Sequence, residues 1–351
     1  GGVNLFDLTY LNNSVYTSGL QGTAYGFSVT SPLNNPSLYL FREDIKPPPS
    51  NSVAFTTGYN WKGVSRMNNS NTYDIGTQKK TTTTNLADTT VNIPVGNGIL
   101  FFFRGDKIHN TVNKTALPFS SPEDVTTTQY GKLNTGTVNV KLWFADALGL
   151  GNKLSYTSGW VNSGTSSLRG GFNFVGNPYA STINWEKYNR NGANSSIYGT
   201  VSTTIWVYNE ASKQFESYTQ KTSSITSADT TTNINPGTTS AGASSASNMI
   251  ASGQGFFVQT TAAGQTLSFR ETAKTSTQPT ASKLHNLMGK PKELVDAPEP
   301  LLRLKLQKDS INTDEIAIRI SDKASTKFVI NEDAEDMGGF GALESLSAFS
   351  S

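Results

Sequence analysis

Short apolar segments, rich in aromatic and β-branched residues, alternate along the chain with polar stretches of Gly, Asn, Ser, Thr and Pro. Segments of this length, bounded by turn-forming residues, are typical of β-strands. The 3.6-residue periodicity of an amphipathic helix is almost absent. The pattern therefore predicts an all-β fold, with strands at residues 37–41, 98–103, 137–144, 172–175, 203–208, 255–259, 301–306 and 315–320.

The last two of these segments show the clearest alternation. Leucines alternate with basic residues over 302–306, and isoleucines alternate with other residues over 316–320. A period of two places successive side chains on opposite faces of a strand. We therefore expect two half-buried strands that belong to one sandwich.

Three sequence strings occur twice, in the same order in each half of the chain. The matched pairs are 29–32 with 175–178, 38–43 with 205–210, and 96–101 with 253–258. The same order with different spacing is expected of a duplicated β unit whose surface loops have changed length. The alternative is that two unrelated β-sandwiches share such turn and aromatic strings by chance.

Composition divides the chain into parts. We predict two tandem antiparallel β-sandwich units at 1–145 and 146–271, and a partial third β segment at 301–351. Within the second unit, 219–248 consists almost entirely of small polar residues and is expected to be a long exposed loop. Residues 272–300, which contain Lys, Pro and Ser, are expected to form a linker. The last segment is too short for a stable sandwich and is expected to be incomplete.

Charge and cysteine content exclude several functions. The 351 residues include 28 Lys and Arg, 26 Asp and Glu, and no Cys. A net charge of +2 gives little electrostatic reason to bind nucleic acid or an anionic membrane. No apolar run reaches the roughly 18–20 residues of a membrane-spanning helix. Without Cys there are no disulfides, thiol nucleophiles or Cys-ligated metals, and we expect no metal or cofactor.

Several strings together resemble a known family. Residues 171–185, 205–209 and 252–258 resemble the region before the C-terminal sorting domain in large Bacteroidota surface proteins exported by the type IX secretion system. Residues 93–106 and 301–334 resemble the same family. The resemblance implies contact with the type IX secretion machinery and a location outside the cell or on its outer surface. It also implies a non-enzymatic stalk, adhesin or filament subunit.

The same resemblance bears on the C-terminal segment. In such relatives a further strand-rich stretch and a sorting domain follow, and the present sequence stops before them. We therefore expect the chain to be a fragment, or its last segment to complete the sheet of a neighbour. If the protein polymerises, a partner's strand can pair with an open sheet edge in 301–351.

Candidate catalytic residues are few. His109 and His285 are the two histidines, and no Gly-x-Ser-x-Gly string provides a serine nucleophile. Glu186 lies next to Trp185 and near Tyr188, but hydrolysis of a glycoside needs a second carboxylate at roughly 5–9 Å. We therefore expect that the protein is not an enzyme.

An alternative function is that of a carbohydrate-binding module. Exposed Trp61, Trp185 or Tyr188 would stack on sugar rings in that case. The other interpretation of Trp185 is burial beneath the Gly-Asn-Pro-Tyr turn at 176–179, with Glu186 in solvent.

Three kinds of short motif remain. Thr89, Thr230 and Ser310 each follow Asp in a polar stretch, which resembles the O-glycosylation acceptor pattern of Bacteroidota. The acidic run 331–336 lacks the spacing of an EF-hand and is expected to be a solvated loop rather than a calcium site. The tripeptide at 104–106 spells Arg-Gly-Asp, an integrin-ligand string, but it ends an apolar strand at a turn and is not expected to bind integrin.

Overall fold

The computed structural model describes twenty-one stretches of the chain. They are residues 13–19, 22–30, 36–41, 61–63, 73–74, 90–91, 95–116, 119–127, 132–142, 171–188, 201–209, 213–221, 225–240, 246–260, 262, 264–277, 301–307, 313–320, 325, 329 and 333–334.

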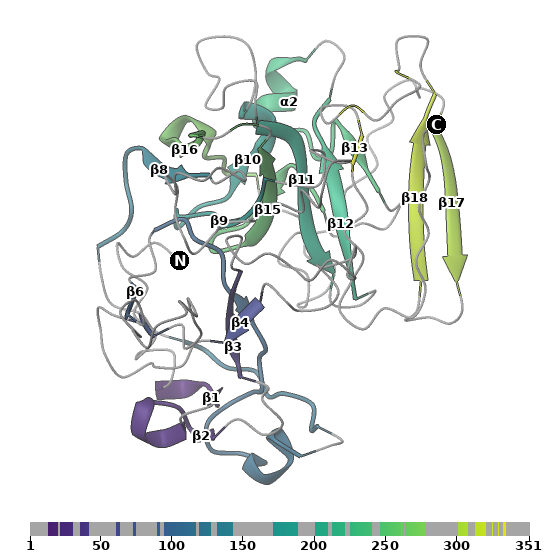
Figure 1. The fold of residues 1–351 in the computed structure, drawn as a ribbon. Helices are drawn as coiled ribbons and strands as arrows, with labels where there is room; N and C mark the ends of the chain where they lie inside the picture. Colours follow the sequence, from purple (N-terminus) through teal and green to yellow (C-terminus); the bar gives the residue numbers. More distant parts are fainter. Residues whose placement is uncertain are drawn as a thin grey trace, which may run out of the picture.

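Within these stretches the chain forms eighteen β-strands in small, mostly antiparallel sheets, with one short α-helix and four 3-10 helices (Figure 1). The predicted all-β fold is therefore confirmed. In chain order the elements are β1 (Ser18–Gly19), η1 (Gly22–Tyr25), β2 (Val29–Thr30), β3 (Leu38–Phe41), β4 (Trp61–Gly63), β5 (Tyr73–Asp74), β6 (Thr90–Val91), β7 (Leu100–Phe101), η3 (Thr111–Lys114), β8 (Val138–Lys141), β9 (Phe172–Gly176), β10 (Ile183–Asn184), η4 (Trp185–Lys187), β11 (Val201–Asn209), β12 (Gln214–Thr219), α2 (Ser227–Thr231), β13 (Thr238–Thr239), β14 (Met249–Ile250), β15 (Gly255–Thr260), β16 (Thr266–Phe269), η5 (Glu271–Ala273), β17 (Leu301–Gln307) and β18 (Thr313–Arg319).

The largest sheet has five antiparallel strands in the order β13–β12–β11–β15–β9. Its central strands contain short apolar runs, at 205–208 in β11 and 256–258 in β15, because both faces of the sheet are covered there. Ile205 and Val258 belong to a core cluster on one face, whereas Trp206 and Phe257 belong to a second cluster on the other face. The sheet therefore forms the middle layer of this part of the molecule.

The first of these clusters is closed by two small sheets, β8 with β16 and β10 with β14. Val140 and Leu142 reach it from the chain before residue 145, and Leu267 and Phe269 reach it from β16. A sheet therefore crosses the predicted boundary between 1–145 and 146–271, because β8 pairs with β16. Turn-like composition marks loops, but it does not show with which sheet a strand pairs.

The second cluster joins the first half of the chain to the central sheet. Phe41 of β3 and Trp61 of β4 pack edge-on against Phe257, with ring centroids 4.8 and 5.9 Å from it. Trp61 also meets Phe174 at 5.1 Å. The two halves therefore share an aromatic core, with β3 and β4 beside the sheet (Figure 1).

Strand register supports the predicted duplication. Alignment of 38–43 with 205–210, and of 96–101 with 253–258, makes β3 the counterpart of β11 and β7 the counterpart of β15. Both pairs of strands are antiparallel and have equivalent registers: Leu38 opposite Phe101 and Tyr39 opposite Leu100 in the first half, Ile205 opposite Val258 and Trp206 opposite Phe257 in the second. Chance similarity of turn strings would not by itself produce the same cross-strand partners.

The described parts of 219–248 are not the exposed loop that composition predicted. They contain the end of β12, helix α2 and β13, and Asp229 and Asn248 are fully buried. The Asn248 side chain donates to Asn184 Oδ1 at 3.0 Å, and the Asn184 side chain donates to the Asp229 carbonyl at 3.1 Å. Polar side chains, rather than aromatic packing, hold this segment against the core, which explains why hydrophobicity did not reveal it.

The C-terminal strands form a hairpin, β17–β18, with Leu304 opposite Ile316. Both strands were predicted, but β17 is exposed along its whole length rather than half-buried. Arg303 donates to the carbonyls of Thr239 and Ser240, so the hairpin lies beside β13 at the edge of the central sheet (Figure 1).

The start of the predicted linker 272–300 belongs to the folded part instead. Ala273 is buried, and Thr275 N donates to the Thr182 carbonyl at 3.0 Å.

Candidate functional site

The three aromatic residues predicted to bind glycans are buried. Trp185 and Tyr188 are 0% exposed and Trp61 is 6% exposed. Trp185 stacks on Tyr188 at 5.0 Å, and its indole N–H donates to the Thr203 carbonyl at 2.8 Å. These rings cannot stack on a sugar, so that prediction is wrong. The alternative interpretation, a buried Trp185, is confirmed.

Glu186 is also buried, although the sequence suggested a solvated side chain. Its carboxylate accepts hydrogen bonds from the Tyr218 hydroxyl and from Lys221 N, the latter at 3.1 Å. The same hydroxyl accepts from Gly237 N at 2.9 Å. Glu186 therefore fastens β12 and the following segment to η4, and its position does not open to a substrate.

Of the predicted acceptor residues, the structure places Thr230 alone. It lies in α2 rather than in a loop, and its hydroxyl donates to the Ser227 carbonyl at 3.0 Å. The preceding Asp229 is buried and completes a capping box with Thr226. Thr89 and Ser310 lie outside the described residues, as does His285.

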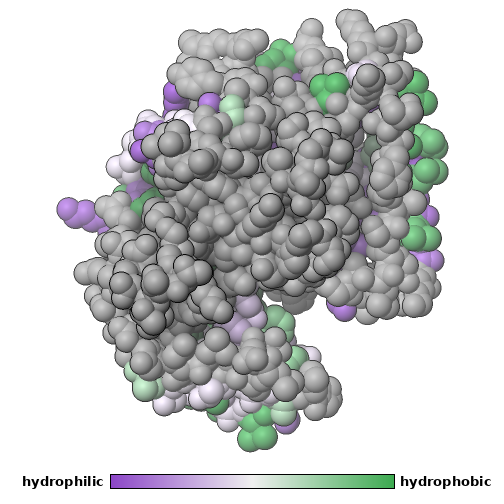
Figure 2. All heavy atoms as spheres, viewed as in Figure 1, coloured by the Kyte–Doolittle hydropathy of each residue, from purple (hydrophilic) through white to green (hydrophobic). Residues whose placement is uncertain are grey.

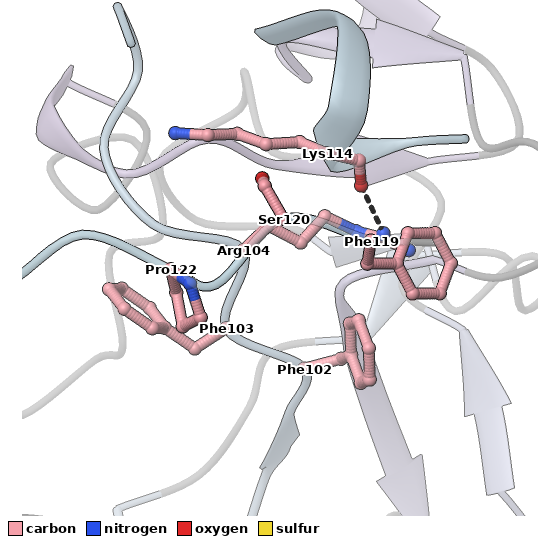
Figure 3. A pocket seen from close by; sticks show the side chains of 7 residues that line it. All are labelled: Phe102, Phe103, Arg104, Lys114, Phe119, Ser120 and Pro122. Atoms are coloured by element: carbon pink, nitrogen blue, oxygen red, sulfur yellow. Dashed lines mark hydrogen bonds between the residues drawn. The ribbon is translucent and has the colours of Figure 1, made fainter. Parts of the chain in front are cut away.

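A pocket lies in the segment that follows β7. Phe102 and Phe103 follow β7 directly and are 48% and 37% exposed. Phe119, further along the chain, lines the same pocket. A cavity of about 220 Å³ opens between these residues (Figure 3). Its lining consists of Phe102, Phe103, Arg104, Lys114, Phe119, Ser120 and Pro122.

Arg104 forms part of the pocket wall, although only 4% of the residue is exposed. Its guanidinium lies 4.7 Å from the centre of the Phe102 ring and 5.2 Å from that of Phe119, and Nη1 donates to the Lys114 carbonyl at 2.6 Å (Figure 3). Burial lowers the pKa of Arg104, but an arginine stays protonated in proteins. Because Arg104 is enclosed, the Arg-Gly-Asp tripeptide is not presented as an integrin ligand.

Lys114 points away from the guanidinium and holds the other end of the segment (Figure 3). Its side chain is fully buried, and Nζ donates at 2.6 Å to both the Asp106 carbonyl and Glu123 Oε2. Asp106 Oδ1 accepts from the backbone N–H groups of Ile108 and His109 at 3.0 and 2.7 Å. The Lys114 charge is thus balanced locally by Asp106 and Glu123.

These contacts predict an acid-sensitive loop. The backbone N–H of His109 is the main cause of a lowered pKa at Asp106, and the Lys114 side chain is the main cause at Glu123. A carboxyl group whose pKa is lower in the folded state than in the unfolded state stabilises the fold. This stabilisation is complete above the ordinary pKa values of 3.8 and 4.5, and it is lost as the pH falls through the lower pKa values of the folded state. We expect amide exchange of residues 104–116 to accelerate between about pH 4 and pH 2, relative to the central sheet.

Carboxyl NMR titration checks this expectation directly. Titration of Asp106 at an ordinary pKa would contradict the account of the loop.

A second surface feature is an apolar face on the C-terminal hairpin. Paired residues of an antiparallel ladder share a face, so Leu302, Leu304 and Leu306 lie together with Ile316 and Ile318. The three leucines are 40–47% exposed. Figure 2 shows hydrophobic side chains along the edge of the molecule that carries β17 and β18. We call this surface the hairpin face.

The fold and these surfaces define an all-β protein with an aromatic-walled pocket and an exposed apolar hairpin. The chain belongs to the family described as "Domain of unknown function (DUF8693)", which matches residues 50–336. No curated protein and no solved structure matches the chain. Among the residues that the structure places, no helix is long and apolar enough to cross a membrane, and no three acidic or histidine side chains gather as metal ligands.

Proposed function

We propose that the chain is a non-enzymatic structural or adhesive part of an exported bacterial surface protein, built from repeated β-sandwich units. The resemblance to type IX secreted proteins supports export, a location outside the cell, and O-glycosylation on exposed Ser and Thr. The matching registers of β3–β7 and β11–β15 support a repeated module. Units that pack into one another through shared aromatic cores suit a stalk or filament.

The single observation that carries the proposal is the hairpin face. A two-stranded hairpin is marginally stable in water and gains stability from a third strand or from cover on its apolar face. The occupant that we propose is a second copy of this chain. The aliphatic part of this face is complementary to itself across a two-fold axis, with the charged Asp314 at one end, opposite Leu306. A net charge of only +2 opposes association weakly.

Leu304→Thr should weaken self-association. Burial of a leucine side chain stabilises an interface by about 1.5–3 kcal/mol, so the dissociation constant should rise roughly tenfold or more. Sedimentation velocity of the full chain from 1 to 200 µM gives this constant. The matched control is Lys305→Thr, which introduces the same residue one position away on the opposite face of β17.

The expected pattern is concentration-dependent association of the wild type and of Lys305→Thr, with a loss in Leu304→Thr. A wild-type protein that stays monomeric over this range would exclude assembly through the hairpin face. An equal loss in both variants would show that the hairpin was disturbed in general, and it would also count against the proposal.

A further inference from the structure

We propose that the pocket between Phe102, Phe119 and Ser120 binds a small neutral aromatic ring that carries one hydroxyl group, a phenol. None of the residues of the hairpin face lines this pocket. The inference therefore goes beyond the proposed structural role and does not rest on it.

The walls of the pocket favour an aromatic ring. Of the large hydrophobic side chains that are exposed in the described part of the chain, most lie either within 102–119 or within 301–320. Those of the second group form the open hairpin face, whereas Phe102, Phe103 and Phe119 of the first group enclose a cavity together with Pro122 (Figure 3). Partly exposed phenyl rings offer their faces and edges to a further ring, which gains stability beyond the area that it buries.

The two cations beside the pocket favour a neutral ligand, because both are engaged within the protein. Lys114 Nζ donates to the Asp106 carbonyl and to Glu123 Oε2. Arg104 Nη1 donates to the Lys114 carbonyl, and the Phe102 and Phe119 rings pack against its guanidinium. An anionic ligand would therefore lose its hydration with little return.

Arg104 has a structural part in this site. Its guanidinium lies 4.7 and 5.2 Å from the centres of the Phe102 and Phe119 rings, and these two rings meet edge-on with their centres 6.0 Å apart. The buried arginine thus holds two walls of the pocket in a fixed arrangement. A wall that is ordered before binding costs less conformational entropy when a ligand arrives.

Ser120 provides the partner for one hydroxyl group. Its backbone N–H donates to the Asn113 carbonyl at 3.1 Å, which fixes its position. Its hydroxyl group lines the cavity, is buried, and has no hydrogen-bond partner among the residues that the structure describes. A ligand hydroxyl would satisfy this group and would itself be satisfied. A sugar ring would bring several further hydroxyl groups against phenyl walls, which is unfavourable.

The volume limits the ligand to one ring. Pockets for drug-sized ligands enclose roughly 300–1,000 Å³, and this cavity measures about 220 Å³. A ligand of about seven heavy atoms at the efficiency of a small fragment binds with a Kd of about 1 mM.

The test compares ligands that differ in one group. Phenol is the probe, benzene lacks only the hydroxyl group, benzoate carries a charge, and glucose is a ring with several hydroxyl groups. Binding to the full chain is followed by saturation-transfer NMR and by shifts of the 102–120 amides. We expect a Kd of about 1 mM for phenol and binding of benzene at least about threefold weaker, since one hydrogen bond is lost. Benzoate and glucose should bind at least about tenfold more weakly than phenol.

Two variants separate the hydrogen bond from the apolar walls. Ser120→Ala removes a hydroxyl group without a partner in the protein, so it should leave the urea midpoint unchanged. It should weaken phenol to the level of benzene and leave benzene unchanged, whereas Phe119→Ala should weaken both ligands. Ile108→Ala is the control and should affect neither, because Ile108 is 77% exposed and does not line the cavity.

Four results would each overturn the proposal. They are no binding of phenol at about 20 mM, more than tenfold above the expected Kd, equal binding of phenol and benzene, an unchanged phenol Kd in Ser120→Ala, and tighter binding of benzoate or glucose than of phenol. Circular dichroism shows whether Phe119→Ala folds. If it does not, the ligand comparison and Ser120→Ala decide.

Discussion

Replacement of Phe257 with alanine is expected to lower the free energy of unfolding by about 3–5 kcal/mol. The Phe257 side chain is fully buried, and its ring meets Phe41 at 4.8 Å, Trp61 at 5.9 Å and Phe174 at 4.8 Å. Truncation leaves a cavity where β3, β4, β9 and β15 meet, and close-packed neighbours refill such a space only in part. Urea unfolding followed by tryptophan fluorescence and by far-UV circular dichroism measures the loss.

The same experiment tests whether the two halves fold together. The shared aromatic core predicts that the two probes give coincident transitions in the wild type. Ile108→Ala, at an exposed position, should change the free energy of unfolding by less than about 0.5 kcal/mol. Separate transitions for β3–β4 and for the central sheet, or a loss below 1 kcal/mol in Phe257→Ala, would show that this core does not join them.

Sequence reasoning found the strands whose side chains are aromatic or β-branched. β3, β8, β9, β11, β15, β17 and β18 all overlap predicted segments. β12 was missed because polar residues occupy its buried positions, including Glu216 and Ser217. The Asn209 side chain donates to Glu216 at 2.6 Å. A strand whose buried groups are satisfied by hydrogen bonds has no hydrophobic pattern to detect.

Exposure of aromatic residues could not be predicted from the same information. Trp185 lies among polar residues in the sequence and Phe102 lies within the apolar segment 98–103, yet Trp185 is buried and Phe102 lines a pocket. The difference arises from segments far apart in the chain, since Trp185 is closed off by β11 and by Phe256 of β15. In the sequence, the pocket could have been recognised only from the two segments that line it, Phe-Phe-Arg at 102–104 and Pro-Phe-Ser-Ser-Pro at 118–122.

The duplication and the pairing of strands across the predicted domain boundary have one explanation. A β unit that duplicates keeps its strand register, as β3–β7 and β11–β15 do, because a one-residue slip would move every core side chain to the other face. The contacts between the copies are under no such constraint. The Gly96 carbonyl accepts from Gly176 N at 2.9 Å, and β8 pairs with β16. The strand pairing within a repeat can therefore be predicted from the sequence, whereas the packing between repeats cannot.

The Gly-Asn-Pro turn shows what one of the repeated strings does. Asn177 is buried, and its Nδ2 lies within hydrogen-bonding distance of the carbonyls of Ser181, Ile250 and Ala251, at 2.8, 3.1 and 3.0 Å. Its Oδ1 accepts from Tyr179 N at 3.0 Å. The backbone of Asn177 also donates to the Gln254 carbonyl at 3.0 Å. One amide side chain thus ties the end of β9 to the turn before β15.

Asn177→Ala is therefore expected to lower the free energy of unfolding by about 2–4 kcal/mol, because it leaves several buried backbone groups without partners. Asn177→Asp keeps the acceptor for Tyr179 N but turns an oxygen toward the three carbonyls, so at neutral pH it should cost at least as much. Asn113→Ala, at an exposed position, is the matched control and should cost less than about 0.5 kcal/mol. Urea unfolding of all three variants ranks them. If Asn177→Asp were as stable as the wild type, the donors of Nδ2 would not hold the two turns together.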